Sequence, residues 1–105
     1  MNIGIKNEFE YLAREWYSGV SIHSGWHQMR KHPTAQRIVD LGESVVPCLI
    51  HKLKTDKWIG WSHLLKEITK FSPYQPVVEN GFAKINVYEY ANAWIEWGKD
   101  KYEDY

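Results

Sequence analysis

Cysteine is nearly absent from this chain of 105 residues, in which Cys48 is the only one. A single cysteine cannot form an intramolecular disulfide, and it cannot build a zinc module that needs several thiolates. No apolar run approaches the roughly 18–20 residues that a membrane span requires. The N-terminus also lacks the basic and apolar regions of a signal peptide. These absences predict a cytoplasmic protein in a reducing compartment.

The chain also has a formal net charge of zero, because its 13 Lys and Arg residues balance 13 Asp and Glu residues. A nucleic-acid-binding protein needs a concentrated basic face for its phosphate contacts, and this balance argues against one. The distribution is uneven, since residues 30–70 carry eight basic and four acidic side chains. A small nucleic-acid-associated protein therefore remains the alternative, through a basic stretch at residues 30–57 that comprises Arg30, Lys31, Arg37, Lys52, Lys54 and Lys57.

Aromatic side chains are what the chain has in excess, at 15% of residues with six Trp and seven Tyr. So small a core does not usually take all of these rings, and Trp and Tyr are enriched at protein-binding hot spots. We therefore expect several to be partly exposed and to bind a protein partner. The competing interpretation is that they pack under loops and along helix grooves. The candidates in loops or off the best apolar stripes are Trp26, Tyr74, Tyr88 and Trp97.

Apolar residues recur at spacings of three and four in several segments, which is the pattern of amphipathic helices. Residues 7–17 show one such face, built by Phe9, Leu12, Ala13 and Trp16, and Ser18-Gly19 is expected to end this helix. Residues 57–69 show another, built by Trp58, Trp61, Leu65 and Ile68, with Leu64 at its edge. A last helix is predicted after Asn86, which is a good N-cap with Glu89 three residues on. Its inner face includes Trp94, and the helix reaches at least residue 97.

The central segment, residues 32–53, predicts an α-α hairpin. Pro33 and Pro47 each stand just inside the start of a helix, where the missing N–H costs little. Gly42 lies between the two helices and favours the left-handed conformation that closes the first one. The second helix, residues 44–55, has the cleanest periodicity, with Val46, Leu49, Ile50 and Leu53 on one face.

Two connecting segments carry weaker signals. Residues 18–31 predict a loop with one or two helical turns. Residues 70–85 contain two prolines and an Asn80-Gly81 turn signal, which argue against a helix. The stretches on either side of that turn leave open a small β-hairpin as the alternative to an irregular connector.

The order and spacing of several motifs resemble a family of small bacterial and phage-borne proteins that have no assigned activity. The motifs are HPxxQ from His32, the Leu-Gly and Val-Pro steps, the WxxxLxxIT pattern ending at Thr69, and AWIEWG ending at Gly98. Lys70 departs from the family pattern, which has Gly after Ile-Thr. The resemblance implies an all-helical fold and no reaction, cofactor or catalytic residue. The Leu-Gly-to-Leu-Ile segment alone also resembles the helix pair of a HEAT repeat.

Candidate chemistry is sparse. His23 and His27 would share a helical face as metal-binding pairs do, with His32 as the nearest third ligand, but catalytic zinc usually also needs a Glu base. Cys48 and His51 are three residues apart on what we expect to be the outer side of their helix. A nucleophile needs an oriented base, and no group is evident for that role. We expect a buried or half-buried structural thiol, and a structural cap at His32.

The sequence thus predicts a single all-α domain over residues 1–105, a compact bundle of four or five short helices around a HEAT-like α-α hairpin. The leading hypothesis is a non-enzymatic protein-binding module with no cofactor and no metal. A phage or mobile-element accessory protein that inhibits or modulates a host protein fits this hypothesis and the resemblance.

Overall fold

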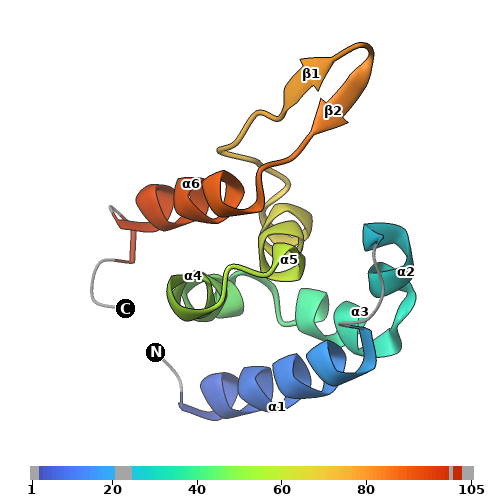
Figure 1. The fold of residues 1–105 in the computed structure, drawn as a ribbon. Coiled ribbons are helices and arrows are strands. Elements are labelled where there is room, and N and C mark those ends of the chain that lie inside the picture. Colours follow the sequence, from blue (N-terminus) through green and yellow to red (C-terminus); the bar gives the residue numbers. More distant parts are fainter. Residues whose placement is uncertain (1–2, 21–24, 100, 103–105) are drawn as a thin grey trace.

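The computed structural model describes residues 3–20, 25–99 and 101–102, and it confirms the all-α class with one small sheet added (Figure 1). The described residues form six α-helices, a 3-10 turn and two strands. In chain order they are α1 (Ile3–Val20), α2 (Trp26–Lys31), α3 (Pro33–Asp40), η1 (Gly42–Val45), α4 (Val46–Thr55), α5 (Ile59–Thr69), β1 (Val77–Glu79), β2 (Phe82–Lys84) and α6 (Val87–Lys99).

The helices stack in tiers (Figure 1). Helix α1 packs against α3 on one side of the molecule, α4 and α5 pack together in the middle, and α6 covers both of them on the other side. The two strands precede α6 in the chain and project from the bundle near its first residues (Figure 1). They pair with each other and form a sheet of two strands. The core therefore lies between the helices, and the sheet takes no part in it.

The predicted helix pair forms at residues 33–55. Gly42 has φ +69°, so it adopts the left-handed conformation expected after the first helix. Residues 42–45 then make a 3-10 turn, which moves the start of α4 from the expected residue 44 to Val46. His32 caps α3 as expected, because its Nδ1 accepts a hydrogen bond of 3.2 Å from the Thr34 amide.

Helix α1 is longer than the predicted residues 7–17, and it runs through Ser18 and Gly19, which were expected to end it. A Cβ at Gly19 would lie 2.7 Å from the His32 Nε2 atom, so glycine allows α1 to approach the start of α3 closely. Val20 is buried in the core. Tertiary packing thus extends this helix past a local stop signal.

The predicted apolar stripes of the long helices form the core. Phe9, Leu12, Ala13 and Trp16 are buried completely, as are the α4 and α5 residues Leu49, Leu53, Trp61 and Leu65. Two expectations are corrected: Ile68 is only partly buried, and Leu64, expected at the edge of its stripe, is fully buried. Helix α5 is therefore rotated slightly from the face that the sequence predicts.

Four of the six tryptophans form one cluster between α1, α2 and α5. The Trp16 ring lies 6.2 Å from Trp26, 4.9 Å from Trp58 and 5.6 Å from Trp61, centroid to centroid. The Trp16 Nε1 atom also donates a buried hydrogen bond of 2.9 Å to the Met29 carbonyl oxygen. This bond and these rings attach α2 to the bundle, which explains why residues 26–31 form a helix without a strong local signal.

The hairpin that the sequence left open is present. Strands β1 and β2 are antiparallel, with Val77 opposite Lys84, Val78 opposite Ala83 and Glu79 opposite Phe82. Asn80 and Gly81 both have positive φ, at 51° and 81°. A two-residue turn with two positive φ values is the type I′ turn that matches the twist of paired strands, and Asn-Gly is its preferred sequence.

Candidate binding surfaces

The structure does not bring the four predicted partner-binding aromatics together. Trp26 lies on α2, partly buried, with its ring 4.9 Å from His63. Tyr74 stacks on Tyr90 at 5.2 Å, and its hydroxyl accepts a hydrogen bond from the Asn86 amide. Tyr88 is 68% exposed in the first turn of α6. Trp97 lies near the other end of that helix. Only Tyr88 is fully on the surface.

Among the described residues, the most exposed apolar surface is the hairpin arm, defined here as residues 77–84. Val77, Val78 and Phe82 are 56%, 67% and 74% exposed, and Ile85 and Tyr88, which follow the arm in the chain, are also exposed. Val77, Val78 and Phe82 are not among the binding candidates that the sequence predicts. The Asn80-Gly81 signal between short β-favouring stretches could have identified them, because a hairpin without a neighbouring layer must expose both faces.

The two faces of the hairpin arm differ in chemistry, since side chains alternate along a strand. The pair Val78 and Ala83 lies on one face, which carries no charge. The other face carries Val77, Phe82 and an ion pair in which the Lys84 Nζ atom is 2.8 Å from a Glu79 carboxylate oxygen. The arm is therefore apolar on one side and self-neutralised on the other.

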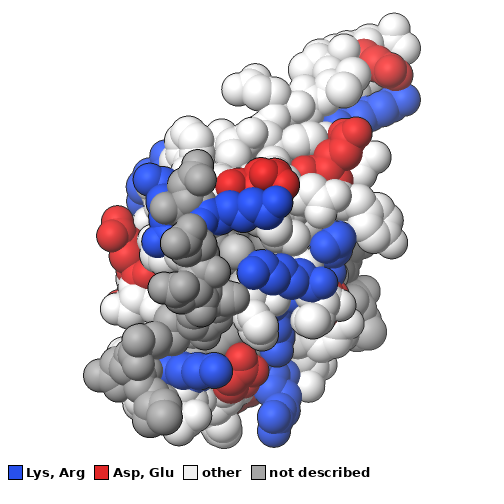
Figure 2. Space-filling view, turned by 90° about the vertical axis from the view of Figure 1, so that its left-hand side faces the viewer, with Lys and Arg blue, Asp and Glu red and all other residues white. Residues whose placement is uncertain are grey.

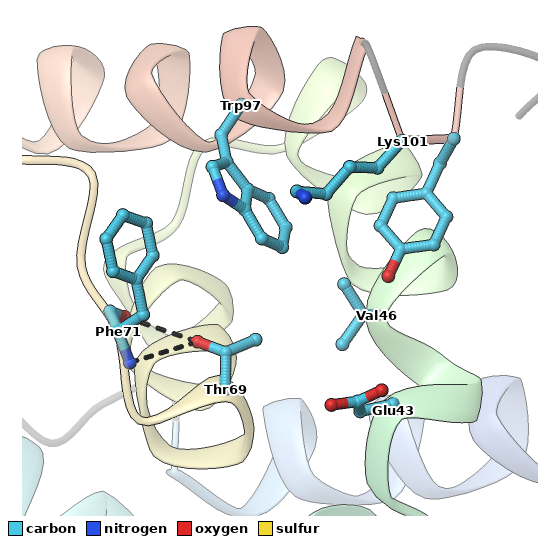
Figure 3. Close-up of a pocket in the computed structure, with 7 residues that line it drawn as sticks. Glu43, Val46, Thr69, Phe71, Trp97 and Lys101 are labelled. Carbon is cyan, nitrogen blue, oxygen red and sulfur yellow. Dashed lines mark hydrogen bonds between the residues drawn. The ribbon is translucent and has the colours of Figure 1, made fainter.

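A pocket of about 320 Å³ opens at the opposite end of α6 (Figure 3). It lies where η1, the start of α4, the end of α5 and the end of α6 meet, and it is lined by Glu43, Val46, Thr69, Phe71, Trp97, Lys101 and Tyr102. Three of these seven residues are aromatic. The Trp97 ring centroid is 6.1 Å from that of Phe71 and 6.2 Å from that of Tyr102.

The chain turn after α5 positions Phe71 in this pocket. Lys70 adopts the left-handed conformation with φ 59°, at the position where the resembled family has Gly. The Thr69 hydroxyl accepts a hydrogen bond of 3.3 Å from the Phe71 amide (Figure 3). Lys70 thus ends α5 in the left-handed conformation that glycine adopts without strain, so the lysine backbone is strained there.

The pocket holds charges of both signs. The Lys101 Nζ atom lies 5.4 Å from the centroid of the Trp97 ring, which is the distance of a cation–π contact. Glu43 is on the far wall, with its carboxylate directed into the pocket (Figure 3). Burial, followed by the Glu43 charge, raises the pKa of the Tyr102 hydroxyl above its usual value. Among the described side chains, Glu43 has no ion-pair partner.

A second pocket, of about 200 Å³ between α1 and the start of α5, has similar groups in a different arrangement. Lys52 lies 5.8 Å from the Trp61 ring and also pairs with Glu10 at 3.3 Å. The Asp56 carboxylate accepts hydrogen bonds from the Trp58 amide and the Trp61 indole. Lys52, Glu10 and Asp56 of this pocket are therefore already engaged within the protein.

The candidate metal and thiol chemistry finds no support in geometry. His23 lies outside the described residues, and no group of three His, Cys, Asp or Glu in the described part of the chain could hold a metal ion. Cys48 is 2% exposed, so it is the buried thiol that we expected, although not on the outer side of its helix. His63 contacts Trp26 and Tyr90, and burial, with a smaller contribution from Lys66, lowers the pKa of its imidazole to about 4.

Internal partners engage three basic side chains of the stretch at residues 30–57, those of Arg30, Lys52 and Lys57. Arg30 pairs with Glu67 at 3.5 Å, and Lys52 pairs with Glu10. The Lys57 Nζ atom donates a hydrogen bond of 3.1 Å to the Leu53 carbonyl oxygen. On the face shown in Figure 2, acidic side chains of the described residues lie next to some of the basic ones, and a few basic side chains lie close together near the middle. The internal contacts of Arg30, Lys52 and Lys57 leave less basic charge for phosphate binding.

Comparisons with protein-family models, with curated proteins and with solved structures gave no match to this chain. The resemblance to the small bacterial and phage-borne family therefore stays a prediction. Within the described ranges, no helix has the length and apolar character needed to cross a membrane.

Proposed function

We propose that this chain is a non-enzymatic protein-binding module whose hairpin arm inserts into an apolar groove of a partner protein. The observation that supports the proposal is the exposure of Val77, Val78 and Phe82 on a projecting arm. Apolar side chains are exposed on both faces of the arm, Val77 and Phe82 on one and Val78 on the other, and exposed apolar surface of this kind on a monomeric protein marks a candidate interaction site.

The shape and charge of the arm define the partner surface. The arm projects from the bundle, so its complement is concave (Figure 1). Its charges, on Glu79 and Lys84, already pair with each other, so the complement needs no excess charge. Each strand also has one edge without a neighbour in the two-stranded sheet of the described residues. Such an edge can pair with an extended segment that lines the groove.

The four aromatic residues predicted to bind a partner have different roles in this proposal. Tyr88 adjoins the arm and extends its contact surface, and Tyr74 supports the base of the arm through Asn86. Trp26 and Trp97 lie elsewhere and act as secondary contacts. A phage or mobile-element accessory protein that inhibits or modulates a host protein in the cytoplasm would fit this mode of binding.

Photo-crosslinking tests the proposal directly. A benzoylphenylalanine side chain is placed at Phe82 and, as a matched control, at Tyr11, which is also well exposed but lies on α1 away from the arm. We expect the residue-82 probe to capture one protein that the residue-11 probe does not capture. The captured protein is then purified, and its affinity is measured for the wild type, Val78→Asp and Tyr11→Ala. Val78→Asp should weaken binding by about tenfold or more, because it buries a charge in an apolar groove.

Three results would overturn the proposal. Equal affinity of the wild type and Val78→Asp would show that the arm is not the contact. Capture of a second copy of this chain, with a dimer in sedimentation analysis, would make the arm a self-association surface. Capture of nucleic acid in place of protein would favour the alternative interpretation.

A further inference from the structure

The pocket in Figure 3 has the components of a cation-binding site. Phe71, Trp97 and Tyr102 place three rings along its wall. The negative face of an aromatic ring attracts a cation within about 6 Å of its centroid, and groups of such rings recognise quaternary and methylated ammonium ligands. The hairpin arm has no part in this pocket, so the inference goes beyond the proposed protein binding.

Lys101 shows that a cation is accommodated here. Its ammonium group lies 5.4 Å from the centroid of the Trp97 ring, and its side chain extends toward that ring (Figure 3). Lys101 is an exposed residue beyond the end of α6, so it can leave this position without disturbing the helix. The lysine thus occupies part of the site as an internal substitute for a ligand.

Glu43 supplies the charge that such a ligand needs. Its carboxylate faces the rings from the opposite wall, and in the part of the chain that the structure describes it has no ion-pair partner. The pocket of Lys52 and Trp61 is the contrast, because there Glu10 already pairs with the lysine. A carboxylate without a partner beside three rings favours a ligand with a diffuse positive charge.

The size of the pocket limits the ligand to a small head group. Its volume of about 320 Å³ is at the lower end of ligand pockets, which run from roughly 300 to 1,000 Å³. We propose that this pocket binds a methylated ammonium group between the Trp97 ring and the Glu43 carboxylate, with Lys101 as an internal competitor. The group is a free quaternary ammonium compound or a methylated lysine side chain, since both present the same chemistry.

Choline titrations followed by NMR test the proposal. The reporter is the indole N–H signal of Trp97, assigned from a Trp97→Phe spectrum. Choline should shift this signal with millimolar affinity, and dimethylbutanol, its uncharged isostere, should bind more weakly by about threefold or more. A peptide with trimethyllysine, titrated in parallel, distinguishes the two ligand sources: tighter binding of the peptide assigns a methylated lysine, and tighter binding of choline assigns a free compound.

Two variants and one control complete the test. Lys101→Ala should tighten choline binding severalfold by removing the competitor, and Glu43→Gln should weaken it by about threefold or more. Glu89→Gln, which changes an exposed carboxylate in the first turn of α6, should leave it unchanged. All three side chains are exposed, so the fold should tolerate the changes. Equal binding of choline and dimethylbutanol, or no choline binding by Lys101→Ala, would overturn the proposal.

Discussion

Leu53 provides the sharpest test of how this small core is held together. Its side chain is 0% exposed, and its helix α4 packs against both α5 and α6. Truncation to Ala removes buried methyl and methylene groups, and neighbours on two sides restrict collapse of the cavity. Leu→Ala changes at such sites cost about 2–5 kcal/mol. We expect Leu53→Ala to lower the free energy of unfolding by about 3 kcal/mol, from a total of roughly 5–15 kcal/mol for a domain of this size.

Urea unfolding followed by far-UV circular dichroism measures this loss. The midpoint should fall while the slope stays constant, because the change leaves the surface exposed on unfolding nearly unaltered. The melting temperature should fall by about 10–20 °C. Val78→Ala, which truncates an apolar side chain on the hairpin arm, is the matched control and should change stability by less than about 0.5 kcal/mol. A loss below about 0.5 kcal/mol for Leu53→Ala would refute the position of α4 in the core.

Three further predictions concern other parts of the molecule. Lys70→Gly should stabilise the fold by about 1 kcal/mol in the same urea assay, because glycine adopts the left-handed conformation without strain; a destabilised variant would contradict the αL helix end. Mobility-shift titrations at low and physiological salt should show no specific nucleic-acid complex, and a salt-sensitive complex abolished by Lys52→Glu or Lys54→Glu would reverse the ranking of functions. The folded protein keeps His63 neutral down to a pKa of about 4, whereas the unfolded chain binds the proton near 6.5, so stability should fall as the pH drops between these values. His63→Phe should flatten this part of the unfolding profile, and an unchanged slope would contradict the burial of the imidazole.

The sequence predicted the elements whose signals are local. Helices α3 and α4 follow from Pro33, Gly42 and Pro47, because capping and conformational preference act within one or two turns. The apolar stripe of α1 identified its core face for the same reason. Helix α2 was predicted only as a turn or two, since the bond that attaches it joins Trp16 to Met29, 13 residues apart.

The candidate sites were less predictable from the sequence. The hairpin arm depends on the lack of a covering helix among the described residues, and the pocket depends on residues that are far apart in the sequence. The turn at Asn80-Gly81 marked the hairpin, but no local pattern shows that no helix covers it. The pocket combines Glu43 with Trp97, which meet only after α4, α5 and α6 have packed. The sequence identified Trp97 because it lies off the best apolar stripe of its helix, and it did not identify Phe71, Tyr102 or Glu43 as neighbours.

The tryptophan cluster gives the protein a spectroscopic property of its own. The rings of Trp16, Trp58 and Trp61 have centroids between 4.9 and 5.6 Å apart, so their electronic transitions couple strongly. Near-ultraviolet circular dichroism arises from such fixed aromatic packing and is lost in molten states that keep their helices. Trp94 and Trp97 form a second close pair, with centroids 5.1 Å apart, so the near-ultraviolet signal reports aromatic packing across the bundle, including docking of α1 on α5, separately from helix content. Folding of this chain can therefore be followed at two levels in one sample without an added label.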